Sequence, residues 1–281
     1  NRDLFFISLI ITIPIFLISI QPDPGSAIIF LAFLFPIFRE GLNIRFLFHL
    51  FAIGIIFFLS LTIGFLITIL LFLVFYISYV FYESRNKRKV KLSKFILTIF
   101  LYISLALSTN YVFENVLEQR HRDRINIILG KELDTRGVGY NINQSKIAIG
   151  SGGFAGIGFL KGTQTKGDFV PRQHTDYIFS TIGEEWGFLG SSLIIFLFSY
   201  LIIRIIQRAE KQPIHYKRVY CYCFASLLFM HFFINIGMSL GILPTIGIPL
   251  PFISYGGSNL LSFSIMLFIY LNFDSSRLKE S

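Results

Sequence analysis

Long apolar stretches separated by short polar ones run through the chain from its first residues. They fall at about residues 4–20, 25–38, 44–60, 62–82, 95–113, 190–206, 219–240 and 258–273. Each is close to, or somewhat shorter than, the ~20 residues with which a helix crosses the hydrocarbon core of a bilayer. The pattern predicts an all-α, polytopic helical membrane protein with about eight transmembrane helices in this chain. No basic leader precedes the first stretch, which favours a spanning helix over a signal peptide.

The apolar stretch from residue 44 to residue 82 is too long for one crossing. At ~1.5 Å per residue a single helix would be roughly 58 Å long, about twice the thickness of the hydrocarbon core. We therefore expect a hairpin of two helices that turns near residues 60–64.

Basic residues indicate on which side each loop lies, because Lys and Arg gather in short cytoplasmic loops. With the hairpin in place, the main basic runs all fall on the cytoplasmic side. They comprise Arg39, Arg45, Arg85, Lys87, Arg88, Lys89, Lys91, Lys94, Arg204, Arg208, Lys211, Lys217, Arg218, Arg277 and Lys279. The chain then divides into N-terminal transmembrane helices in 1–113, a large extracytoplasmic loop in 114–189, and C-terminal transmembrane helices with a short cytoplasmic tail in 190–281.

Composition agrees with a membrane location and excludes several classes of function. Hydrophobic residues make up 54% of the chain and charged residues 15%, with a mean hydropathy of +0.67, which is unusual for a soluble domain. The net charge of +9 follows the loops, so it favours contact with membrane lipids over nucleic acid. Cys221 and Cys223 lie in an apolar run and are predicted to pack there, without a disulfide or a metal site.

Familiar nucleotide and hydrolase motifs are missing from the sequence. The glycine-rich segment GSGGFAGIGFLKGT, residues 150–163, has neither the P-loop order nor the dinucleotide-binding pattern, and is predicted to be a tight loop on the outer surface. The chain also has no G-x-S-x-G, H-E-x-x-H or C-x-x-C motif.

Two of the three remaining polar motifs flank predicted membrane helices. In QPDPGSA, Asp23 is interpreted as the N-cap of a helix that has Pro24 in its first turn. GILPTIGIPLPFISYGGS, residues 241–258, combines several prolines and glycines beside a membrane helix. Irregular backbone at that depth persists only where protein buries it or where it lines a cavity. We expect a wall of a polar cleft that carries Ser254, Tyr255 and Ser258.

The third motif, PRQHTDYIFSTIGEEWG, covers residues 171–187 and gathers polar side chains in an otherwise apolar chain. Thr181 and Glu184 fit a capping box, which would explain one carboxylate structurally. Asp176 has no such structural explanation. Long loops in compact proteins are often functional, which makes Asp176 a candidate for chemistry.

These three regions together resemble the SEDS family of bacterial cell-wall proteins (shape, elongation, division, sporulation), and most closely its rod-shape members. The resemblance lies in QPDPGSA, in the segment from residue 137 to 190 and in the segment from residue 235 to 261. It implies a polytopic protein of the bacterial inner membrane, a peptidoglycan glycosyltransferase that polymerises lipid II and works with a class B penicillin-binding protein. It also implies that the essential aspartate of the family is Asp176.

The sequence departs from the family pattern at two places. About four further N-terminal helices of the family have no counterpart in this chain. The hairpin and basic loop within 62–113 stand where the family usually has a single crossing.

The chemistry of such a transferase suggests roles for the polar residues. A sugar hydroxyl attacks an anomeric carbon while a lipid pyrophosphate leaves, so a base must take a proton and cations must stabilise phosphates.

Asp176 is the candidate general base, and His174 is expected to orient its loop. Lys146, Arg124 and Arg172 are candidates for binding the pyrophosphate, with solvated loop charges as the alternative. Glu184 and Glu185 could hold a divalent cation, Mg²⁺ or Mn²⁺, although no cofactor is certain. Asp23, Ser254, Tyr255 and Ser258 complete the predicted substrate site.

Two other functions remain open on the sequence alone. A flippase that moves lipid II would need ionisable residues at mid-membrane depth. Apart from Arg45 and Arg204 at the ends of their stretches, only His49 and His231 lie within the apolar stretches, so the transferase is favoured. A scaffold of a cell-wall complex would leave Asp176 replaceable.

Overall fold

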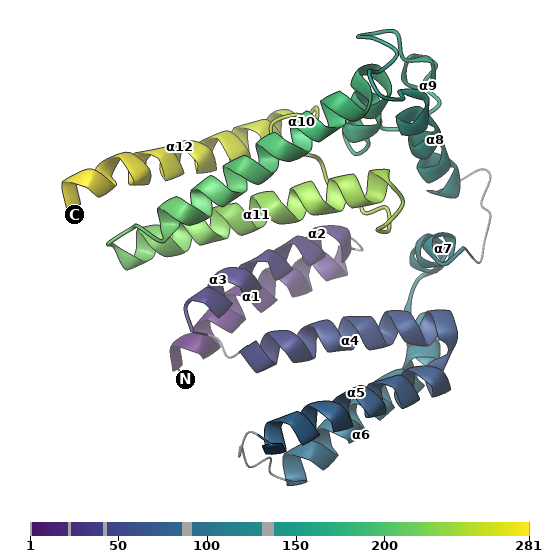
Figure 1. Cartoon of the computed structure of the whole chain (residues 1–281), viewed down its shortest axis with the longest axis vertical. Coiled ribbons are helices and arrows are strands. Elements are labelled where there is room, and N and C mark those ends of the chain that lie inside the picture. Colours follow the sequence, from purple (N-terminus) through teal and green to yellow (C-terminus); the bar gives the residue numbers. More distant parts are fainter. Residues whose placement is uncertain (1, 22–23, 42–43, 86–91, 131–137, 281) are drawn as a thin grey trace. The chain divides into compact units, whose positions relative to one another are not determined.

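The computed structural model describes residues 2–21, 24–41, 44–85, 92–130 and 138–280 (Figure 1). Within these ranges every regular element is helical. The chain forms two compact units, one of Asn1–Leu42 with Leu133–Ser281 and one of Asn43–Glu132. These units follow packing, whereas the three segments expected from the sequence follow sides of a membrane.

Several helices in the described ranges have the length and apolar character of membrane spans. Three are long enough to cross a bilayer: Ile96–Val116, Ile178–Ala209 and His215–Ser239. Four shorter apolar helices lie at Leu9–Ile20, Gly25–Arg39, Phe48–Ile63 and Phe65–Ser78. The prediction of an all-helical membrane protein is confirmed at this level.

The smaller unit contains the hairpin expected from the length of its apolar stretch. Its elements are α4 (Ile44–Ile63), α5 (Phe65–Arg85), α6 (Leu92–Tyr111), the π-helical turn η2 (Val112–Val116) and α7 (Gln119–Ile128). The turn between α4 and α5 is at Gly64, whose φ of +89° is a conformation that glycine adopts without strain. The predicted hairpin is therefore confirmed.

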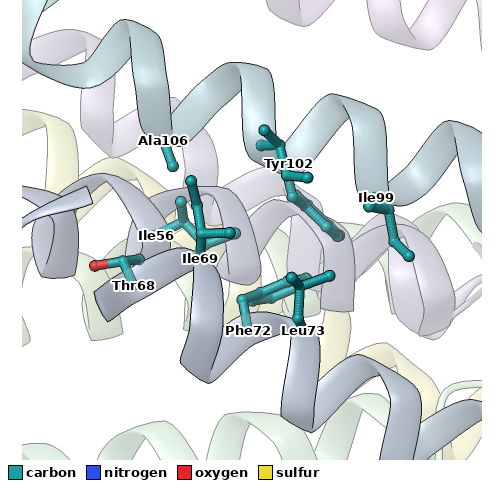
Figure 2. A pocket seen from close by; sticks show the side chains of 9 residues that line it. Ile56, Thr68, Ile69, Phe72, Leu73, Ile99, Tyr102 and Ala106 are labelled. Carbon is teal, nitrogen blue, oxygen red and sulfur yellow. The ribbon is translucent and has the colours of Figure 1, made fainter. Parts of the chain in front are cut away.

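A small apolar core holds α4, α5 and α6 together. Ile56 of α4, Phe72 of α5 and Tyr102 of α6 point toward one another around a pocket of about 10 Å³ (Figure 2). That volume is about the minimum that holds one water, and the walls are almost wholly apolar. The pocket is a packing gap between helices, not a substrate site.

The larger unit is a helical bundle with a compact loop region at one end. Its elements are α1 (Arg2–Ile20), α2 (Pro24–Ile29), the 3₁₀ turn η1 (Phe30–Phe33), α3 (Leu34–Arg39), α8 (Val138–Ser151), α9 (Thr163–Lys166), α10 (Ile178–Ala209), α11 (His215–Ser239) and α12 (Gly257–Glu280). α11 packs against both α10 and α12. α8 and α9 lie at the end of α10 where that helix begins (Figure 1). Phe224, Leu228 and Phe263 are buried in the core of the bundle.

The helical stretch from Pro24 to Arg39, expected as a single span, is continuous but tightens to a 3₁₀ turn in its middle. Pro36 has no N–H to donate to the carbonyl of Ala32, and the turn that contains Ala32 is 3₁₀.

Ion pairs fasten the end of this segment to the bundle. Arg39 Nη2 lies 2.6 Å from Glu210 Oε2, and Arg218 Nε lies 3.0 Å from Glu40 Oε1. The hydrogen bonds from Arg218 hold the pKa of Glu40 below its ordinary value.

α10 begins at Ile178, twelve residues before the apolar stretch expected to start at residue 190, and it bends at Gly187. Gly187 has φ 62° and ψ −155°, so the helical hydrogen bonds across it are missing. The glycine-rich loop replaces them with four backbone hydrogen bonds of 2.9 to 3.2 Å. They run from Phe188 N to Gly153 O, Leu189 N to Phe154 O, Ile157 N to Glu184 O, and Gly158 N to Glu185 O. The predicted tight loop is therefore fastened to the bend of α10.

We predict that Gly187→Ala destabilises the protein. The φ and ψ values at this position are nearly exclusive to glycine, and such strain costs about 1–3 kcal/mol. A Cβ would also lie 2.4 Å from the backbone nitrogen of Gly156. The thermal unfolding midpoint in detergent should fall clearly below that of the wild type.

Gly150→Ala is the matched control, because Gly150 lies in α8 with open space around its Cα. Alanine should be tolerated there, since glycine within a helix is less favourable by roughly 0.5–1 kcal/mol. Equal losses in the two variants would contradict the role assigned to Gly187.

Candidate active site

Asp176 lies in a tight turn directly before α10. The carbonyl of Arg172 accepts hydrogen bonds from the backbone N–H groups of Thr175, Asp176 and Tyr177, at 3.0 to 3.3 Å. Arg172 itself has a φ of +55°, an uncommon value for a residue with a side chain. The turn brings the carboxylate of Asp176 and the guanidinium of Arg172 to the same side, with Nη1 and Oδ2 3.6 Å apart.

Three consecutive carbonyls of this turn are held from outside it. They accept hydrogen bonds from α11 and from the loop that joins α11 to α12. The bonds run from Tyr255 N to His174 O at 2.8 Å, from Ser254 Oγ to Thr175 O at 2.6 Å, and from Asn235 Nδ2 to Asp176 O at 2.9 Å. We call residues 174–176 with these three donors the carbonyl clamp. It fixes the backbone of Asp176 in the larger unit.

Asn235 and Ser254 each make a second contact that joins the clamp to the α11–α12 loop. Asn235 Nδ2 also donates to Ile248 O at 2.8 Å, and the N–H of Leu250 donates to Ser254 Oγ at 2.8 Å. Asn235 is fully buried and Ser254 nearly so. These contacts give the irregular proline-rich segment a structural role, because it holds the turn that carries Asp176.

Sequence reasoning missed Asn235. The residue stands in the last third of α11, among apolar neighbours. A polar amide within a membrane helix usually has a hydrogen-bonding partner, because an unpaired one is costly in that environment. That signal singles out the residue but does not reveal the partner, which lies 59 residues away in the sequence.

The Asp176 carboxylate is accessible at one edge. Its side chain is 14% exposed, while that of Arg172 is 77% exposed, so the ion pair opens to solvent on the arginine side. Gly247 of the α11–α12 loop lies beside the carboxylate, and a Cβ there would be 3.3 Å from Oδ2. A carboxylate in this setting can accept a proton from a group that approaches along the open edge.

An open pocket of about 360 Å³ adjoins the clamp. His174, Ile178, Ile253 and Tyr255 line it. His174 and Tyr255, both expected in the substrate site, are therefore brought together. Ser258 is exposed in the first turn of α12, three residues after Tyr255.

Lys146 lies on α8, on the same unit as Asp176. α8 is joined to the end of α11 by a hydrogen bond of 2.8 Å from Ser145 Oγ to Ser239 O. The Lys146 side chain lies across Gly241. A Cβ added at Gly241 would be 2.4 Å from the Cε of Lys146. The residue is exposed, so its ammonium group is available to an anion.

Glu184 has a structural role that the sequence did not indicate. Its carboxylate is fully buried and accepts hydrogen bonds from the N–H groups of Gln164 at 2.7 Å and Thr165 at 2.9 Å. It therefore caps the first turn of α9, a different helix from its own. The predicted capping box with Thr181 is wrong, because α10 already begins at Ile178 and α9 occupies both carboxylate oxygens.

The predicted cation site finds little support among the described residues. Glu184 does not fit as a ligand, because its oxygens face N–H groups. Glu185 is also buried, with 9% of its surface exposed. In the described ranges no group of three or more His, Cys, Asp and Glu side chains could hold a metal ion.

Two predicted site residues cannot be placed beside Asp176. Arg124 lies on α7 in the smaller unit. Asp23 lies outside the described residues, although α2 does begin at Pro24, where the sequence predicted a helix start. Both residues stay predictions.

Comparison with known proteins places the chain in a family. The family model for cell cycle proteins of the FtsW, RodA and SpoVE type matches residues 68–279. The peptidoglycan glycosyltransferase MrdB of Escherichia coli strain K12 is 44% identical over 146 residues, which are 52% of this chain and 40% of that protein. The peptidoglycan glycosyltransferase RodA of Treponema pallidum strain Nichols is 34% identical over 176 residues, which are 63% of this chain and 41% of that protein.

A solved structure agrees with these relatives. A chain of a peptidoglycan synthase complex in which polymerization and crosslinking are coordinated superposes with a TM-score of 0.50 at 27% identity, covering 78% of this chain and 60% of that one. The matched regions span about 40% of the length of the two curated relatives. The chain belongs to the FtsW, RodA and SpoVE family, the SEDS proteins, and is RodA-like.

Proposed function

We propose that the chain is part of a peptidoglycan glycosyltransferase that polymerises lipid II into glycan strands during cell elongation and shape maintenance. The observation that carries the proposal is the carbonyl clamp, which holds a carboxylate beside an open pocket and an exposed arginine. The relatives named peptidoglycan glycosyltransferases support the same reaction class.

In this mechanism Asp176 is the general base. It accepts the proton of the acceptor's 4-hydroxyl as that oxygen forms a bond to the anomeric carbon of the donor sugar. The bond from that carbon to the lipid pyrophosphate breaks, and the electron pair leaves with the pyrophosphate. Preorganised cations stabilise the negative charge that develops there. Arg172 and Lys146 are the proposed phosphate ligands on the larger unit.

The clamp matches what a general base requires. A base must stay within hydrogen-bond reach of its proton while the substrate moves, so its backbone has to be immobile. Three hydrogen bonds to consecutive carbonyls provide that rigidity without using the carboxylate itself. His174 and Tyr255, which line the pocket, are proposed to contact the sugars. Ser258 is proposed to contact the adjoining glycan chain.

The membrane topology and a partner protein complete the proposal. We infer eight crossings in this chain, with residues 114–189 on the extracytoplasmic face of a bacterial inner membrane and the C-terminal tail in the cytoplasm. The proposed partner is a class B penicillin-binding protein that crosslinks the strands. The solved synthase complex, in which polymerization and crosslinking are coordinated, supports such a pairing.

We predict that Asp176→Asn abolishes polymerisation. Asparagine keeps the shape of the side chain but cannot take the proton, and a general base typically contributes about 10²- to 10⁴-fold in rate. The complete protein, purified with its transpeptidase partner, would receive labelled lipid II, and glycan polymer would be measured on a gel.

Asp168→Asn is the matched control, because it makes the same change in the same loop. Asp168 is exposed and accepts a hydrogen bond from Gln173 Nε2 at 3.0 Å, which an asparagine oxygen can also accept. This variant should polymerise normally. Equal polymer from the wild type and Asp176→Asn would exclude Asp176 as the base. Lipid II movement across liposomes without any polymer would favour the flippase.

We predict that Asn235→Leu lowers kcat with little change in the KM for lipid II. The substitution removes both amide donors, which frees the Asp176 backbone from α11, and misplacement by ~1 Å can cost about 10²-fold in rate. Asn272→Leu on the exposed face of α12 is the control and should keep full activity. A variant that folds with wild-type kcat, or whose loss is confined to KM, would contradict the positioning role.

A further inference from the structure

Large apolar side chains surround the bend of α10 and are exposed. They come from the glycine-rich loop and from α10 itself, and each is 54% to 68% exposed. The set consists of Phe154, Phe159, Leu160, Trp186, Phe188 and Leu189. We call it the apolar rim. Its rings are ordered in pairs, with the centroids of Phe154 and Phe188 6.0 Å apart and those of Phe159 and Trp186 6.1 Å apart.

The apolar rim is continuous with the exposed apolar face of α10. Below the bend that face continues through Leu193, Phe196, Leu197, Tyr200 and Ile203. The first charged residue after them is Arg204, which is exposed. Arg204 follows Trp186 by 18 residues in the sequence, about 27 Å at ~1.5 Å per residue, which is close to the ~30 Å of a hydrocarbon core. If Arg204 marks one boundary of the core, Trp186 lies at the other.

The chemistry of the rim suits that boundary. Aromatic rings of Trp and Tyr favour the level of the lipid headgroups, and Phe adds buried apolar area. Lys161 within the loop and Lys166 after it are exposed and can reach lipid phosphates.

The backbone of the loop is also prepared for a lipid environment. Irregular backbone near the hydrocarbon is tolerated only where its polar groups are paired within the protein. The four hydrogen bonds between the loop and the bend of α10 pair the groups that Gly187 releases. The loop thus presents side chains outward while its nearest backbone groups face α10.

We propose that the apolar rim inserts among the phospholipids at the headgroup boundary of the leaflet on the Asp176 side. The inference depends on α10 crossing the membrane and not on the reaction that Asp176 performs. Because α10 begins two residues after Asp176, the insertion also sets the depth of the carbonyl clamp relative to the lipid surface.

The chain offers a direct probe, since Trp186 is its single tryptophan. The complete protein would be reconstituted in liposomes, with any tryptophan outside this chain replaced by phenylalanine. Lipids brominated near the headgroup end of the acyl chain should quench Trp186 strongly, and lipids brominated near the chain terminus more weakly. Acrylamide in the water should quench it far less than it quenches the unfolded protein.

Two further variants, both in a Trp186→Phe background, test the loop and calibrate depth. Phe159→Trp moves the probe onto the glycine-rich loop and should show the same shallow profile. Phe196→Trp moves it ten residues along the exposed face, roughly 15 Å deeper, and should be quenched best by bromine at the chain terminus. Both replaced side chains are exposed, so the fold should accept the exchange.

Full access of Trp186 to acrylamide with no quenching by either lipid would overturn the proposal. Protection from acrylamide together with no lipid quenching would also overturn it, because a protein surface would then cover the rim. A shallow profile at Trp186 and Phe159→Trp with a deep profile at Phe196→Trp would establish the insertion, whatever the outcome of the polymerisation assay.

Discussion

The hydrogen bonds to the carbonyls of residues 174–176 determine where Asp176 lies. They come from the amide side chain of Asn235, the hydroxyl of Ser254 and the backbone N–H of Tyr255. Asn235 and Ser254 are buried, so their hydrogen bonds pair polar groups that would be costly to leave unpaired inside the bundle. The carboxylate of Asp176 is left out of this network and is accessible at the open edge.

The same requirement for paired backbone groups explains the bend of α10. A glycine interrupts the helix at residue 187, and the helical partners lost there are replaced by groups of the glycine-rich loop. This exchange lets a membrane helix continue directly into the loop region. The loop region is therefore joined to α10 by four backbone hydrogen bonds, and its apolar rim and the clamp lie in the same unit.

Glu184 shows that the role predicted from spacing along the chain can differ from the role found in the folded protein. Its spacing from Thr181 fits a capping box, and its neighbour Glu185 suggests a cation site. In the folded protein Glu184 serves the N–H groups of residues 164 and 165 instead, some twenty residues earlier in the chain. Buried carboxylates that are saturated by N–H donors stabilise structure and are poor ligands for substrates.

The sequence by itself determined the helical membrane class, the hairpin that turns at Gly64 and the start of α2 at Pro24. It also singled out Asp176 as the candidate base, which stays a prediction. These features follow from apolar stretch length, local backbone preference and a family motif, all of which are local. Only the tertiary structure decided the partners of Asp176, the contribution of Asn235, the capping of α9 by Glu184 and the early start of α10. Each of these depends on hydrogen bonds between residues 19 to 81 positions apart, or on the close approach of two backbones. Local patterns do not encode such pairings, because any donor with an unsatisfied N–H or O–H could have made them.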